Sequence, residues 1–131
     1  MDVDETLKLA LKFHTANDME KANRLYDKIL AKHGDHPDAN HLSGLISLSV
    51  GDIEDAMEKI KKAITAFPNQ AIYYNSLGNV LKLNNKSEQA ERAYFSALEM
   101  YKTLKLIHSF IIYLKKFPKH DIFFARTRSF S

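Results

Sequence analysis

The strongest constraint on this sequence is an internal repeat with a period of 34 residues, seen in Gly78 standing 34 positions after Gly44. Residues 37–70 align with residues 71–104, and residues 3–36 align with both as a third copy. The positions that match in all three copies are Ala10, Gly44 and Gly78; Ala22, Ala56 and Ala90; and Tyr26, Ile60 and Tyr94. A repeat kept in register over about four-fifths of the chain predicts stacked copies of one structural unit.

Each copy is predicted to be two helices joined by a tight turn. In the first copy, Leu9, Ala10 and Phe13 share one helical face, and residues 22–30 repeat the pattern. Between the two halves stands Asn or Gly, which accepts the left-handed conformation that ends a helix. Asp or Ser then follows and can cap the next helix. These junctions are Asn17-Asp18, Gly51-Asp52 and Asn85-Lys86-Ser87, while Pro37 and Pro68 mark the joints between copies.

A helix–turn–helix repeat of this length and pattern resembles the tetratricopeptide repeat family. The family's small eighth residue corresponds to Ala10, Gly44 and Gly78. Its proline near the end of the repeat is present only as Pro68, and Gly34 and Lys102 stand in the other copies. The resemblance implies an all-α solenoid of three stacked right-handed hairpins, with repeats at 3–36, 37–70 and 71–104.

The residues that follow the third copy are predicted to form a seventh helix and a tail. Residues 105–116 are apolar nearly all round and are interpreted as a capping helix that covers the open end of the solenoid, which gives a repeat domain over residues 1–116. Residues 117–131 form a basic and aromatic tail. The tail could fold over the apolar end of the solenoid, join copies of the chain, or contact an anionic membrane or a nucleic acid.

In the tetratricopeptide family, the first helices of successive hairpins line a concave surface that binds peptides. The matching positions in the second and third copies are His41, Leu45, Leu48, Asn75, Asn79 and Lys82, which are the predicted peptide-binding residues. Asn side chains suit this role because they both donate hydrogen bonds to an extended backbone and accept them. The alternatives are that the two Asn are merely solvated and that the two Leu pack on neighbouring helices or on the tail.

Some members of the family hold acidic C-terminal tails with a clamp of Lys, Asn and Arg side chains. The corresponding positions here hold Leu7 and Leu11, then Leu42, then Ile72 and Ser76. The sequence therefore argues against capture of an acidic tail of that kind.

Composition and motifs argue against catalysis and against a cofactor. The chain has no Cys, and no nucleophile elbow, Gly-rich phosphate loop or zinc-protease motif is present. His33, His36 and His41 do not reproduce a closed zinc spacing, so no metal site is predicted. The acids at Glu54-Asp55 and the lysines from Lys59 to Lys62 are expected to be solvated charges on outer helix faces.

The remaining sequence features concern location. The acidic start lacks the apolar run of a secretory signal, and no stretch reaches the roughly 18 apolar residues of a membrane span. With no Cys, the chain suits a reducing compartment, and a cytoplasmic protein is predicted. Nucleic acid is not an expected partner of the repeat domain, because the excess of basic residues lies after Leu104.

Three functions are consistent with these features. The first is a non-catalytic scaffold that binds a peptide or helix of a partner protein in its concave groove. The second is a self-assembling structural module that joins copies, as a homo-oligomer, through the apolar helix 105–116. The third is the N-terminal targeting arm of a larger enzyme, because residues 25–42 resemble repeats that precede catalytic domains in some bacterial glycosyl- and sulfotransferases.

Overall fold

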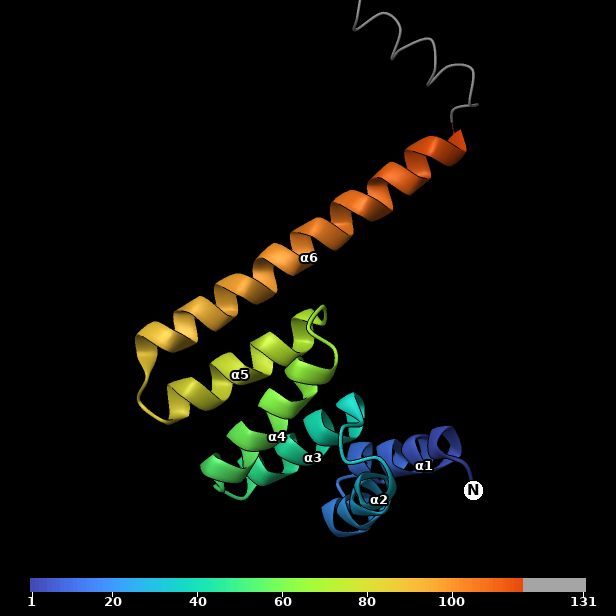
Figure 1. The fold of residues 1–131 in the computed structure, drawn as a ribbon, viewed down its shortest axis with the longest axis vertical. Coiled ribbons are helices and arrows are strands. Elements are labelled where there is room, and N and C mark those ends of the chain that lie inside the picture. Colours follow the sequence, from blue (N-terminus) through green and yellow to red (C-terminus); the bar gives the residue numbers. More distant parts are fainter. Residues whose placement is uncertain (117–131) are drawn as a thin grey trace, which may run out of the picture. The chain divides into compact units, whose positions relative to one another are not determined.

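The structure is a computed structural model that describes residues 1–116. The predicted tail, residues 117–131, lies outside the described residues, and so do the interpretations attached to it. The described residues form six helices and no strand, which confirms the all-α prediction (Figure 1). The helices are α1 (Val3–Thr15), α2 (Met19–Lys32), α3 (Pro37–Ser49), α4 (Ile53–Ala66), α5 (Ala71–Leu83) and α6 (Ser87–Lys116).

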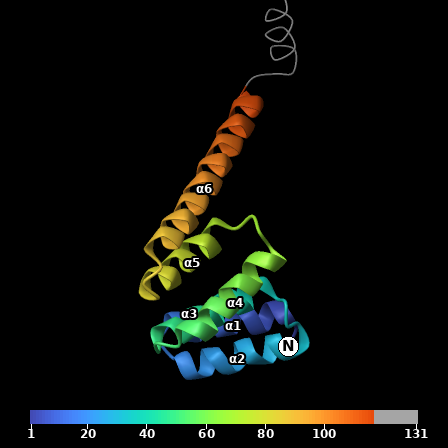
Figure 2. The ribbon, with the colours of Figure 1, turned by 60° about the vertical axis from the view of Figure 1, so that its left-hand side comes forward.

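The helices pair as hairpins, as the repeat predicted. Helix α1 packs on α2 and α3 packs on α4, and the pairs lie side by side in both ribbon views (Figures 1 and 2). Successive hairpins stack through contacts of α2 with α3 and of α4 with α5. The first turns of α6 complete the third hairpin by packing Ala90 and Ala93 with Leu81 of α5.

The chain reverses direction in all three hairpins through one residue in the left-handed conformation. Asn17, Gly51 and Asn85 occupy equivalent positions and have φ values of 62°, 83° and 59°, the left-handed conformation that Gly and Asn accept most readily. Asp18 and Asp52 then cap the following helices, each side chain accepting a hydrogen bond of 3.2 Å from the backbone N–H three residues on. These local signals fix where each hairpin reverses direction.

Close packing inside each hairpin explains the small residue at its eighth position. A Cβ built on Gly78 would clash with the ring of Tyr94. At Gly44 the nearest side chain atom, from Ile60, is 3.1 Å away. Tyr26 and Ile60 are fully buried, and each such side chain stabilises the fold by about 1.5–3 kcal/mol.

Helix α6 corrects the expectation of seven helices. Residues 105–116 are helical, as predicted, but they continue α6 without a break at Leu104, so that α6 alone contains 30 residues. In the first two copies, the second helix stops at Lys32 and at Ala66, two residues before Gly34 and Pro68. The third copy has Lys102 at that position, and lysine propagates a helix well.

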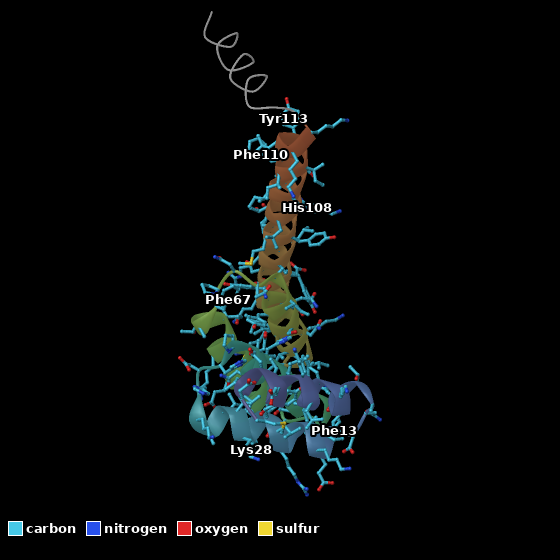
Figure 3. The ribbon with its side chains drawn as sticks, turned by 90° about the vertical axis from the view of Figure 1, so that its right-hand side faces the viewer. Phe13, Lys28, Phe67, His108, Phe110 and Tyr113 are labelled. Atoms are coloured by element: carbon cyan, nitrogen blue, oxygen red, sulfur yellow. The ribbon has the colours of Figure 1, made fainter. Side chains whose placement is uncertain are left out.

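The contacts divide the chain into two compact units, Met1–Ala97 and the residues from Leu98 onward. The first unit contains the three hydrophobic clusters, which lie within and between the hairpins. In the second unit, side chains of α6 such as His108, Phe110 and Tyr113 project from the helix (Figure 3), and the large apolar side chains from Leu104 to Leu114 are exposed. A capping role for residues 105–116 therefore stays a prediction.

Candidate peptide-binding surface

The six predicted peptide-binding residues lie on α3 and α5 but differ in exposure. Asn75, Asn79 and Lys82 of α5 are exposed. Leu45 and Leu48 of α3 are half-buried, and Leu48 packs against the cluster around Ile60. His41 is buried, with 3% of its surface exposed. The surface therefore offers polar side chains on α5 and partly covered apolar side chains on α3.

The imidazole of His41 is held inside the protein by α5. Its Nε2 lies 2.7 Å from the hydroxyl of Ser76, and its ring lies 4.8 Å from the ring of Tyr73. The hydroxyl of Tyr73 in turn donates to the carboxylate of Asp38. We refer to these four residues, Asp38, His41, Tyr73 and Ser76, as the α3–α5 link, because their polar contacts join the second hairpin to the third.

Burial sets the protonation of the α3–α5 link. Desolvation lowers the pKa of His41. The charge of Asp38 partly opposes this shift, and the charge of His14 adds to it. Burial also raises the pKa of Tyr73, and the bond to Asp38 raises it further. The imidazole is therefore neutral and the phenol protonated at neutral pH, so that the link holds the two hairpins together without a buried positive charge.

The amide of Asn79 is oriented by a tyrosine of the same hairpin. Its Oδ1 accepts a 2.6 Å hydrogen bond from the hydroxyl of Tyr94 on α6. The first copy contains a similar pair, in which Nδ1 of His14 lies 2.9 Å from the hydroxyl of Tyr26. With its oxygen engaged, Asn79 has two N–H groups available for another acceptor.

Sequence reasoning identified Asn79 but missed its partner. A tyrosine at the twenty-fourth position of the repeat, where the second copy has Ile60, carries a hydroxyl that must find a hydrogen bond when its ring is packed. That requirement is visible in the sequence and points to a polar residue on the facing helix. Burial raises the pKa of Tyr26 to about 12, so this hydroxyl stays protonated.

A second polar network corrects the expectation that Asp55 and Lys59 are solvated. The hydroxyl of Ser47 donates to Asp55, and the ammonium of Lys59 lies 2.8 Å from the same carboxylate and 2.9 Å from the hydroxyl of buried Ser43. Bonds from Lys59 and then Ser47 lower the pKa of Asp55. The sequence pattern did not predict this network, because it depends on Ser43 and Ser47. Both serines are buried, although their residue type is common on exposed helix faces.

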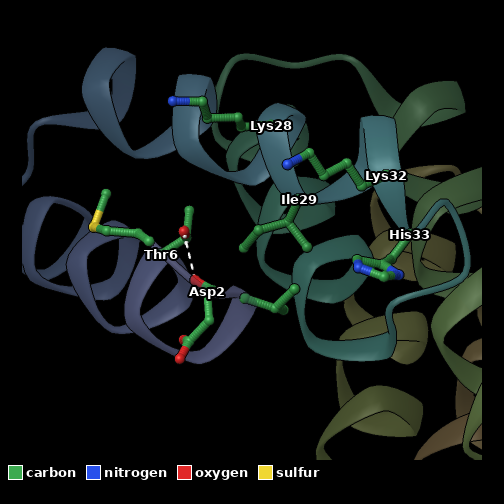
Figure 4. A pocket seen from close by; sticks show the side chains of 8 residues that line it. Asp2, Thr6, Lys28, Ile29, Lys32 and His33 are labelled. Carbon is green, nitrogen blue, oxygen red and sulfur yellow. Dashed lines mark hydrogen bonds between the residues drawn. The ribbon is translucent and has the colours of Figure 1, made fainter.

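The hollow in Figure 4 lies away from the predicted surface. It measures about 370 Å³ and lies between the start of α1 and the end of α2, with Thr6, Lys28 and Ile29 in its wall. None of the six predicted residues lines it.

Metal and membrane sites can be assessed within residues 1–116. Among these residues, no group of three His, Asp or Glu side chains is placed to hold a metal ion. Two of the histidines considered from the sequence have other contacts: His36 caps α3 by accepting from the N–H of Ala39, and His41 lies against Ser76. No helix in the described part of the chain is long and apolar enough to cross a membrane.

No family model matches the chain, and no curated protein sequence is significantly similar to it. Solved structures do resemble it. MamA matches with a TM-score of 0.71 and 20% identity, over 79% of this chain and 61% of MamA. The second tetratricopeptide domain of Spaghetti (RPAP3), bound to the HSP90 peptide SRMEEVD, matches with a TM-score of 0.70 and 15% identity, over 75% of this chain and 91% of that domain.

A third match is the O-GlcNAc transferase of Thermobaculum terrenum, with a TM-score of 0.73 and 26% identity. It covers 75% of this chain but only 19% of the transferase. This chain therefore spans about three-fifths of MamA and a small part of the transferase. The shared feature is the stacked helical hairpin, and the fold is that of a tetratricopeptide-repeat solenoid.

Proposed function

We propose that this chain, a tetratricopeptide-repeat protein, is a non-catalytic scaffold that binds a peptide or helix of a partner protein on the face formed by α1, α3 and α5. The observation that carries the proposal is the row of exposed polar side chains on α5, made up of Asn75, Asn79 and Lys82. Their spacing of four and then three residues places them on one side of the helix.

Asn79 is the central residue of the proposed site. Tyr94 engages its carbonyl oxygen and the residue is exposed, so its N–H groups can donate to a backbone carbonyl of the bound segment. A side chain whose orientation is already fixed loses less conformational entropy on binding than a freely rotating one. Asn75, one turn earlier, can complete a second contact to the same extended backbone.

The apolar part of the proposed site comes from α3. Leu45 and Leu48 are half-buried and can cover an apolar side chain of the ligand. His41 would support this region from beneath, because its contacts to Ser76 and Tyr73 hold α3 against α5. The ligand proposed is therefore a segment with one apolar anchor followed by exposed backbone.

The Spaghetti domain shows that this fold can hold a peptide, although that ligand belongs to that protein. The positions of the acidic-tail clamp hold residues of another kind in this chain. Leu7 and Leu42 pack against the first hydrophobic cluster, and Ser76 is buried against His41. We therefore propose a ligand other than an acidic C-terminal tail.

The test is capture of a partner from native lysate by the full chain and by two variants. The site variant carries Leu45→Glu, Asn75→Ala and Asn79→Ala. The control carries Lys61→Ala, Lys62→Ala and Glu88→Ala, three exposed residues of α4 and α6. We expect a specific protein to bind the wild type and the control and to be lost from the site variant, with equal helicity by circular dichroism. Equal capture by all three proteins would remove this face as the site.

A second candidate is the arm of a larger enzyme, which the partial match to the O-GlcNAc transferase favours. Under this proposal the same face would recruit substrates to a catalytic domain in the same polypeptide. Immunoblotting of native extracts distinguishes the two, because an arm of an enzyme would migrate well above the 15.0 kDa of this chain. The cytoplasm is the proposed location under either function, because a chain without Cys suits a reducing compartment.

A further inference from the structure

The second half of α6 carries a concentrated apolar surface. Among the described residues, 17 large hydrophobic side chains are exposed, and ten of them lie between Leu98 and Leu114. Leu106 is 71% exposed and Phe110 is 59% exposed, and the side chain of Phe110 stands out from the helix in Figure 3. Monomeric proteins in water seldom leave so many neighbouring apolar side chains uncovered, so this surface indicates a contact.

The spacing of these side chains defines a regular stripe. Apolar residues recur along α6 at alternating intervals of four and three, and we call these residues the α6 seam: Ala93, Ala97, Met100, Leu104, Ile107, Ile111 and Leu114. This is the 3.5-residue period with which helices wind around one another in coiled coils. The first residue of the seam, Ala93, is already buried in a helix contact, against Leu81.

We propose that the α6 seam pairs with the α6 seam of a second copy of this chain, with the two helices antiparallel. A seam of this regularity is complementary to itself, because each of its residues fits between the residues of an identical helix. Leu104 then lies opposite Ile107 of the other copy, Met100 opposite Ile111, and the small Ala97 opposite the larger Leu114. Each layer of the contact is filled.

Charge selects the antiparallel arrangement. The seam ends at Lys115 and Lys116, and its exposed start carries Glu99. Parallel helices would bring four lysines together, whereas antiparallel helices separate the two basic ends and place each near Glu99 of the other copy, a carboxylate that also lies 3.7 Å from Lys102. Antiparallel packing also sets the positive end of each helix dipole beside the negative end of its neighbour.

The contact would be short but preformed. Its seam residues from Ala97 to Leu114 span about two and a half heptads, and isolated coiled coils of that length are marginal. Here the helix already extends from a folded hairpin, so less ordering entropy is lost on association. Phe110 lies beside the seam and widens the apolar area.

The first experiment measures the mass of the full chain by sedimentation equilibrium over a range of micromolar concentrations. The seam variant carries Ile107→Lys and Ile111→Lys. The matched control carries Leu106→Lys and Ile112→Lys, which make the same change at exposed positions of the same helix outside the seam. We expect dimers of the wild type and the control, and a dissociation constant raised by about a hundredfold or more in the seam variant.

Two results would overturn the proposal. A wild-type chain that is monomeric throughout would mean that residues 117–131 of the same chain, or a different protein, cover the seam. Equal weakening by the seam and control variants would mean that association depends on general hydrophobicity. Circular dichroism of each variant shows whether α6 remains helical. The mass measurement does not depend on the proposed peptide-binding face, so it tests the α6 seam separately.

The second experiment tests orientation and uses the absence of Cys in the chain. Met100→Cys and Ile111→Cys are made separately, oxidised alone and oxidised as a mixture. In the antiparallel pair, Met100 faces Ile111, so the mixture should cross-link efficiently and each variant alone should not. Position 100 of one copy would lie about 16 Å from position 100 of the other, too far for a disulfide. Efficient cross-linking of each variant with itself would show a parallel pair and refute the proposed orientation.

Discussion

The second and third repeats have the same hairpin but differ in how they end. Helix α4 stops at Ala66, before Pro68, and its residue Ala63 is fully buried. Helix α6 passes the equivalent point at Lys102 and continues to Lys116, and the residue equivalent to Ala63, which is Ala97, is only half-buried. One proline therefore separates a repeat that turns back to be covered from a helix that runs on with an exposed apolar surface.

The difference teaches that a repeat unit is defined by its terminating signal as much as by its core. Ala22, Ala56 and Ala90 are buried in all three copies, so the hairpin forms wherever the small residues recur. Whether the next segment stacks on that hairpin depends on a stop that the third copy lacks. Four experiments test this difference, and they are given in order of decreasing expected effect.

Truncating the bulky residue at the twenty-fourth position should lower the free energy of unfolding more in the second repeat than in the third. Ile60 is fully buried, so Ile60→Ala should lower the free energy of unfolding by about 2–5 kcal/mol through lost burial and a cavity. Tyr94 is half-buried, so Tyr94→Ala should cost less. Urea unfolding followed by circular dichroism measures both, and equal losses would show that the two repeats are equally covered.

Giving the third repeat the stop signal of the second should end α6 early. Lys102→Pro removes a backbone donor inside the helix, which costs about 3 kcal/mol of local helix stability. We expect a loss of helical ellipticity relative to Lys102→Ala, with the unfolding of Met1–Ala97 unchanged because position 102 lies in the other unit. Ellipticity equal to that of Lys102→Ala would mean that proline does not explain the difference between the repeats.

Adding one methyl group to the two helical glycines should affect the two repeats differently. At Gly78 the new Cβ meets the ring of Tyr94, so Gly78→Ala should destabilise the protein by about 1–3 kcal/mol. At Gly44 the new Cβ would lie 3.1 Å from Ile60, which must shift by only a few tenths of an ångström, and alanine favours a helix over glycine by up to about 1 kcal/mol, so Gly44→Ala should cost less than Gly78→Ala. Thermal unfolding compares them, and a larger loss at Gly44 would contradict the packing described.

Lowering the pH is expected to have the smallest of the four effects, a weaker contact between the second and third repeats. His41 has a pKa below its ordinary value of 6.5 in the folded chain, so below pH 6.5 the unfolded chain binds more protons than the folded one. Stability is therefore complete above this pH and falls as the pH drops through it. His41→Gln should reduce the difference in unfolding free energy between pH 7.5 and pH 5.5.

The control for this pH effect is His14→Gln, because burial also lowers the pKa of His14. His14 belongs to the first repeat, and its charge is the smallest of the causes that shift the pKa of His41, so its variant should retain most of the acid response of the α3–α5 link. If the response is the same in His41→Gln as in the wild type, the link does not account for it.

The hairpins could be predicted from the sequence because their signals are local. The left-handed turns at Asn17, Gly51 and Asn85 and the caps that follow act within four residues, and the period of 34 repeats them. The small residues that face Tyr26, Ile60 and Tyr94 were also readable, since two helices can approach closely only where one side chain is small. For these reasons the all-α solenoid could be predicted.

The arrangement of the candidate site depends on contacts between helices, which the sequence pattern does not reveal. The burial of His41, the network around Asp55 and the orientation of Asn79 each depend on a residue from another helix, up to 35 positions away in the case of Ser76. Sequence period assigns a residue to a face of its helix, but it does not say what the neighbouring helix places opposite that face. Contacts between distant residues therefore settled which side chains are engaged and which are exposed.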